Sequence, residues 1–130
     1  MNEQIKEFNA IIEFRVAREK TFTVTVKAWL MQDRWQYNVY ALISEKHELF
    51  NDVSKAINLP FNGGCTYEEI KTMTPAQGIK YGFEREVKTL VVGSDYAHIH
   101  DNYDHHSSPF DGIPHEVLRD AEELAEALKA

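Results

Sequence analysis

The sequence has 130 residues, of which 21 are acidic and 14 are basic, and its formal net charge is −7. This length is typical of one domain with its own core, so we expect a single domain over residues 1–130. Nucleic acid and anionic membranes attract positive surfaces, so the acidic balance argues against direct binding to either.

Cys65 is the only cysteine, so no disulfide can form within the chain, which fits a reducing compartment. Residues 1–7 are too polar and too acidic for a signal peptide. No apolar run approaches the ~18 residues that a membrane span requires. We therefore expect a cytoplasmic protein.

The first third of the chain predicts an antiparallel meander of three strands. Apolar and polar residues alternate within residues 8–18, 21–27 and 35–43, with short polar breaks between them. One face of such a sheet would be wet, and the other would need a cover. We expect Trp35 and Tyr37 to face the core. Trp29 and Tyr40 would lie on the other face, where they could pack within the protein or form a contact patch for a partner.

The rest of the chain predicts further short elements. Helical spacing within residues 45–58 indicates a short helix, and residues 65–67 a brief strand. Two more strands are expected at 79–83 and 87–93, the second of them central in the sheet because it is strongly apolar.

A C-terminal amphipathic helix is the clearest element. Pro114 suits a first helical turn, and an apolar stripe follows with a period near 3.6 while the acidic residues face outward. This helix would cover the open face of the sheet or pair with its copy in a homodimer. The predicted fold class is α+β, with an antiparallel sheet of about five strands, one short helix and this C-terminal helix.

The candidate chemistry lies in the stretch from residue 59 to residue 106, which holds four of the six histidines. Imidazole and carboxylate are ligands for zinc and similar divalent ions. The metal-ligand candidates are His98, His100, Asp95 and Asp101. A bound ion could activate water for hydrolysis, but no complete catalytic motif is present, and a solvated acidic loop rich in histidine is the plainer interpretation.

A polar ligand site in the same stretch is a second hypothesis. Paired glycines can form an anion-binding nest of N–H groups or a simple turn. Asp95 could orient a ligand or cap its own turn, and Cys65 could be a nucleophile with His98 as base or a small core residue. The ligand-binding candidates are Asn62, Gly63, Gly64, Tyr67, Asp95 and His98.

Three segments together resemble a group of small bacteriophage proteins. They are Leu59-Pro60-Phe61-Asn62-Gly63-Gly64-Cys65-Thr66-Tyr67, Val92-Gly93-Ser94-Asp95-Tyr96-Ala97-His98-Ile99-His100-Asp101, and the acidic helix around residues 121–128. The family pattern is His-Gly-Gly-x-Thr, then Gly-x-Asp-x-x-His-x-Gly-Asp, then a C-terminal helix. Asn62 replaces the family's first His, and His100 replaces its Gly, so a metal bound through that first His would lose a ligand here.

The resemblance implies a viral accessory protein acting in the cytoplasm of an infected bacterium. By analogy, such a protein counters host defence by binding a host protein that handles nucleic acid, without catalysis and without a cofactor. Two alternatives remain open. One is a sponge that sequesters a nucleotide immune signal, and the other is a phosphohydrolase that uses a divalent metal.

Overall fold

The computed structural model describes residues 3–8, 11–31, 34–61, 65–74, 77, 81, 87–95 and 108–129. Its elements, in chain order, are β1 (Glu3–Phe8), β2 (Ile11–Arg18), β3 (Phe22–Met31), β4 (Arg34–Ser44), the 3₁₀ helix η1 (Glu48–Asn51), α1 (Val53–Ile57), β5 (Tyr67–Met73), β6 (Val87–Asp95), the 3₁₀ helix η2 (Pro109–Asp111) and α3 (His115–Lys129).

The strands form one sheet in the order β1-β2-β3-β4-β6-β5, and every neighbouring pair is antiparallel. The predicted α+β class, the antiparallel sheet and the C-terminal helix are therefore confirmed. The described sheet has six strands where about five were expected. The predicted meander is present, and β6 is interior, as its apolar sequence indicated.

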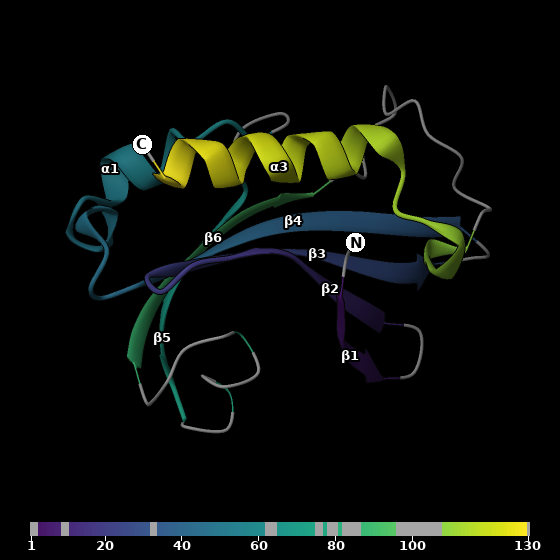
Figure 1. Ribbon diagram of the computed structural model, residues 1–130, viewed down its shortest axis with the longest axis horizontal. Helices are drawn as coiled ribbons and strands as arrows, with labels where there is room; N and C mark the ends of the chain where they lie inside the picture. Colours follow the sequence, from purple (N-terminus) through teal and green to yellow (C-terminus); the bar gives the residue numbers. More distant parts are fainter. Residues whose placement is uncertain are drawn as a thin grey trace.

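The helix α3 lies across one face of the sheet (Figure 1). We call this the helix face. The buried side of α3 consists of Val117, Ala121, Leu124, Ala125 and Leu128. It packs on alternate residues of the central strands, namely Phe22, Val24, Val26, Ala28, Tyr37, Val39, Ala41, Ile43, Leu90 and Val92. The apolar stripe is thus used within the chain, as a cover for the sheet. No described helix has the length and apolar character needed to cross a membrane.

The intervening residues of the same strands project to the opposite side of the sheet, which we call the second face. The expectation that this face is wet is wrong at its centre, because Glu13, Thr23, Thr25 and Thr89 are buried there. The reason lies in part at Tyr81, whose carbonyl oxygen accepts a hydrogen bond from Thr23 Oγ1 and whose hydroxyl donates to Glu13 Oε1. Tyr81 therefore lies over β2 and β3.

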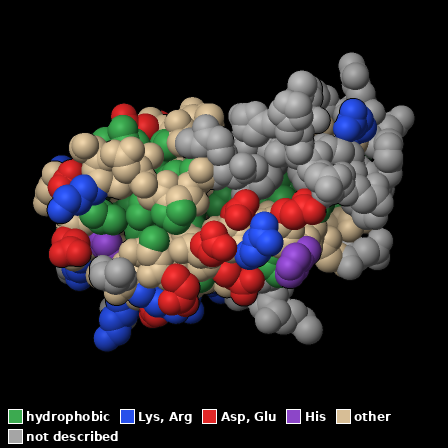
Figure 2. Space-filling view, turned by 90° about the horizontal axis from the view of Figure 1, so that it is seen from above, with side chains coloured by type: hydrophobic (Ala, Val, Ile, Leu, Met, Phe, Trp, Pro, Cys, Tyr) green, Lys and Arg blue, Asp and Glu red, His purple; other side chains and the backbone are tan. Residues whose placement is uncertain are grey.

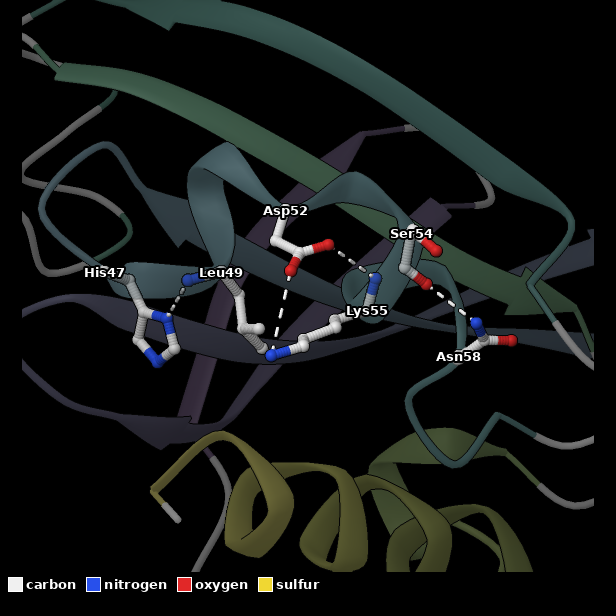
Figure 3. Close-up of polar contacts among 6 residues, drawn as sticks. All are labelled: His47, Leu49, Asp52, Ser54, Lys55 and Asn58. Atoms are coloured by element: carbon white, nitrogen blue, oxygen red, sulfur yellow. Dashed lines mark hydrogen bonds and ion pairs between the residues drawn. The ribbon is translucent and has the colours of Figure 1, made fainter.

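The single helix predicted within residues 45–58 is divided into η1 and α1. Asp52 separates them with a non-helical backbone, and its Oδ1 accepts from the Lys55 N–H, so it caps α1 (Figure 3). Asn58 ends the helix, as expected, and its side chain donates to the Ser54 carbonyl.

Two other strand predictions differ from the structure. The strand expected at 65–67 begins at Tyr67 and continues to Met73. The strand expected at 79–83 falls on residues outside the described part of the chain, except for Tyr81, which is helical.

His47 joins the end of α3 to the connection after β4. Its Nδ1 accepts from the Leu49 N–H at 3.1 Å, so the ring proton is on Nε2, which donates to the Leu128 carbonyl at 2.9 Å. Carbonyls in the last turn of a helix have no partner within the helix, so His47 satisfies one of them. Its ring also meets Phe22 edge to face.

We predict that His47→Ala lowers the free energy of unfolding by about 1–3 kcal/mol, because two hydrogen bonds and a ring contact are lost. Urea denaturation of the purified protein measures this. His115→Ala is the matched control, since His115 is exposed at the start of α3, and it should change stability by less than about 0.5 kcal/mol. Equal stability of the two variants would show that His47 does not hold the helix end.

Candidate functional site

A cavity of about 150 Å³ opens on the second face of the sheet. Strands β2 to β6 and Tyr81 supply its walls, so segments far apart in the sequence meet there. It is lined by Glu13, Lys27, Tyr40, Leu42, Tyr67, Lys71, Met73, Tyr81 and Val91. Leu42, Met73 and Val91 form a small buried apolar cluster, against which the three tyrosines pack. The cavity therefore combines an apolar floor with charged and aromatic walls.

Glu13 is the most unusual residue of this cavity, because it is a carboxylate with only 3% of its surface exposed. Burying a charge is costly unless it is paired. The Tyr81 hydroxyl donates to Glu13 Oε1 at 2.9 Å, and Lys27 faces Glu13 across the β2–β3 pair. Burial raises the pKa of Tyr81, and the neighbouring Glu13 raises that pKa further. Tyr81 therefore keeps its proton and remains a donor.

Two tyrosines, on the strands β4 and β5 that flank β6, form the aromatic wall. The rings of Tyr40 and Tyr67 meet edge to face with their centroids 5.7 Å apart. Lys27 Nζ lies 5.2 Å from the centre of the Tyr40 ring, and Lys71 Nζ lies 5.9 Å from that of Tyr67. Each distance is within the range of a cation–π interaction. Two ammonium groups are thus held at aromatic surfaces of the cavity.

Hydrogen bonds fix both hydroxyl groups. Trp29 Nε1 donates to Asn38 Oδ1 at 2.8 Å, and Asn38 Nδ2 donates to the Tyr40 hydroxyl at 2.9 Å. Burial raises the pKa of Tyr40 in spite of the Asn38 hydrogen bond. Tyr67 donates to Glu69, and this bond raises the pKa of Tyr67. Both phenols are therefore neutral at physiological pH.

Gly93 makes room for this aromatic pair. It lies between Tyr40 on β4 and Tyr67 on β5. A Cβ atom at Gly93 would lie 2.8 Å from the Val39 carbonyl oxygen and closer still to the Tyr40 ring. A side chain at this position would push the Tyr40 ring out of place, so the glycine is required for packing here.

Of the predicted site residues, the structure places Tyr67 in the cavity wall. Asp95 ends β6, where its backbone pairs with Asn38, and its side chain lies outside what the structure describes. The remaining candidates, Asn62, Gly63, Gly64, His98, His100 and Asp101, also lie outside the described residues. The metal and nest hypotheses stay predictions, and the described residues alone contain no group of three or more metal-binding side chains.

Cys65 is partly buried, and its thiol donates to the Tyr67 carbonyl oxygen at 3.0 Å. It also packs against the core on the helix face. This contact fits the interpretation of Cys65 as a small packing residue. The proposed base, His98, lies outside the described residues, so the nucleophile hypothesis stays untested.

A second hollow lies where His47, Lys46 and Glu48 approach the end of α3. It is wider than the cavity on the second face. Its histidine already makes the two hydrogen bonds described above, so we do not take it as the functional site.

Four polar residues of the cavity were missed by the sequence interpretation, namely Glu13, Lys27, Lys71 and Tyr81. Glu13 carried one signal, since it interrupts the apolar run Ile11-Ile12-Glu13-Phe14. Lys27, Lys71 and Tyr81 carried no such signal in the sequence, because only the order of the strands in the sheet brings them together. Trp29 and Tyr40 lie on the second face as predicted, and Tyr40 belongs to the cavity.

Comparisons of this chain with protein-family models, with curated proteins and with solved structures found no match. The resemblance to small bacteriophage proteins therefore stays a prediction, and the site is interpreted from its own geometry.

We predict that Gly93→Ala lowers the free energy of unfolding by about 1–3 kcal/mol, because the new methyl group overpacks against Tyr40. Thermal or urea denaturation measures the change. The same substitution in a Tyr40→Ala background should cost less, since the ring that it displaces is gone. An equal cost in both backgrounds would show that Tyr40 is not the reason for the glycine.

Proposed function

We propose that this protein is a binding protein that sequesters a small ligand of the nucleotide class in the cavity on the second face of its sheet. The observation that carries the proposal is the buried Glu13 carboxylate, held in one cavity with two tyrosine-bound lysines. Concave sites with an apolar lining and a few convergent polar groups are the usual form of small-ligand sites.

The size and lining of the cavity support an aromatic ligand. A volume of about 150 Å³ is the size of cavity that accepts a benzene-sized ring. Stacking of a nucleic-acid base on an aromatic side chain contributes about 1–3 kcal/mol and depends little on which base it is. Tyr40 and Tyr67 supply such surfaces, so a base would occupy the cavity while the rest of the ligand extends toward β5.

The charged groups of the cavity support a ligand that donates hydrogen bonds at one end and carries a negative charge at the other. A buried carboxylate such as Glu13 accepts hydrogen bonds from the amino groups of a base. The ammonium groups of Lys27 and Lys71 suit phosphate oxygens. Lys71 already pairs with Glu69 at 3.7 Å, but both side chains are 49% exposed, and surface pairs of this kind contribute little. A phosphate could therefore replace Glu69 at low cost.

The protonation states favour binding over turnover at this cavity. Glu13 and Tyr81 are hydrogen-bonded to each other, and the raised pKa of Tyr81 keeps its proton in place near neutral pH. The alternative of a metal-dependent phosphohydrolase depends on His98, His100, Asp95 and Asp101 and stays a prediction. In the context that the resemblance implies, the bound ligand would be a nucleotide signal of host defence.

We predict that nucleotides of the cyclic, cyclic-dinucleotide or ADP-ribose type raise the melting temperature, and that calorimetry gives a dissociation constant for at least one of them. A ligand at 100 times its dissociation constant stabilises the fold by about 2.7 kcal/mol. Lys71→Met should weaken binding about tenfold through the loss of a phosphate contact. Tyr67→Ala should weaken it at least as much through the loss of stacking.

Lys55→Met is the matched control for Lys71→Met. Lys55 also pairs with a carboxylate on the surface, at 3.8 Å from Asp52, but it lies on α1 away from the cavity. It should bind the nucleotide like the wild type. The proposal is overturned if no nucleotide of the panel at millimolar concentration shifts the melt, or if Lys71→Met binds like Lys55→Met.

A second candidate function is the inhibition of a host protein by surface binding, and the outer face of α3 favours it. Acidic side chains run along this face (Figure 2), where Glu122, Glu123 and Glu126 are exposed. A partner that handles nucleic acid has a basic surface, and charge complementarity speeds and orients such an encounter. This candidate needs no occupant in the cavity.

The two candidates predict different losses of activity in cells. Phage plating efficiency is measured on bacteria that carry a nucleotide-signalling defence system and express the protein. If the acidic face acts, the triple variant Glu122→Gln, Glu123→Gln and Glu126→Gln should lose most of the protection of the phage, while Lys71→Met retains it. The reverse pattern supports sequestration. Protection that survives in both variants would contradict both candidates.

A further inference from the structure

The strand β5 forms one edge of the sheet, and the other side of β5 has no neighbouring strand among the described elements. Residues 68–72 are exposed on both faces of the strand, and Ile70 has 57% of its surface exposed. An edge of this kind presents unpaired backbone N–H and C=O groups, which form a template for another strand. What pairs with this edge can be inferred from its sequence.

The sequence of β5 is complementary to itself in the antiparallel direction. When two copies pair about Ile70, Glu69 faces the partner's Lys71, and Lys71 faces the partner's Glu69. Ile70 then faces the partner's Ile70 on the side of the helix face. Opposite charges and apolar side chains that face each other across a strand pair are stabilising.

The charges also select this register. Pairing centred on Glu69 would place two glutamates opposite each other, and pairing centred on Lys71 would place two lysines opposite each other. Like charges directly opposite are destabilising. Among the registers that keep the helix faces of both copies on the same side of the joined sheet, the one centred on Ile70 is the one that places each of Glu69 and Lys71 opposite an opposite charge, so it is favoured over its neighbours.

We propose that β5 is the interface of a homodimer in which two sheets join, edge to edge, into one continuous antiparallel sheet. Such an interface is isologous, because the same strand serves both copies and a two-fold axis passes at Ile70. Tyr67, Lys71 and Met73 line the cavity on the second face, so the two cavities would lie on either side of this axis. Tyr67 would then face the partner's Met73 at the cavity wall.

The test uses charge reversal of the full chain, followed by sedimentation equilibrium over a range of concentrations. In Glu69→Lys both chains carry two lysines at 69 and 71, and in Lys71→Glu both carry two glutamates. Each variant alone should raise the dimer dissociation constant about tenfold or more, since both cross-strand pairs become repulsive. An equimolar mixture of the two variants should recover dimerisation, because every pair between unlike chains is then complementary.

The mixture distinguishes loss of contact between two chains from loss of the ion pair within one chain. Glu69 and Lys71 also pair within the chain, and each variant keeps its internal repulsion after mixing, so only contact between chains can restore the dimer. Glu126→Lys is the control, since Glu126 pairs with Lys129 on the exposed side of α3, and it should dimerise like the wild type. A wild-type chain that stays monomeric up to millimolar concentration overturns the proposal. The proposal is also overturned if Glu69→Lys or Lys71→Glu alone dimerises like the wild type, or if the mixture of the two does not recover dimerisation.

Discussion

The packing of α3 on one face of the sheet is the constraint on which the rest of the structure depends. Each fully buried leucine or valine contributes about 1.5–3 kcal/mol, and Val117, Leu124 and Leu128 are all buried in this contact. These contributions are comparable with the whole net stability of a domain, about 5–15 kcal/mol. The helix face therefore supplies the core, and the second face does not have to be purely apolar.

The second face carries buried polar residues as well as apolar ones. It buries Glu13 beside Tyr81, and within the described part of the chain the buried hydroxyls of Thr25 and Thr89 have no hydrogen-bond partner. Unsatisfied buried polar groups lower stability, so apolar residues would suit these positions better if the sheet only had to fold. These polar groups adjoin the cavity that we describe on this face, and the binding function proposed above would account for their presence.

The strands that could be predicted from the sequence are the interior ones. Strands β2, β3 and β4 contact α3, β6 shares the same buried core, and all four carry the alternation or the apolar run that this burial imposes. The two edge strands, β1 and β5, were missed or misplaced. Residues 68–72 of the edge strand β5 are exposed on both faces, so the sequence Tyr67-Glu68-Glu69-Ile70-Lys71-Thr72-Met73 has no periodic apolar pattern. The cavity could not be predicted for a related reason, because the order in which strands join is not visible in any single segment.

The position of α3 in the chain has a consequence for biosynthesis. This helix follows every strand in the sequence, yet it covers residues as early as Phe22 and Val24. During translation all six described strands are made before α3, so the helix face of the nascent sheet stays uncovered until α3 is made. Exposed apolar surface of this kind promotes aggregation and recruits chaperones. Ribosome stalling or premature termination before His115 would therefore release an aggregation-prone product, and productive folding must wait for the helix.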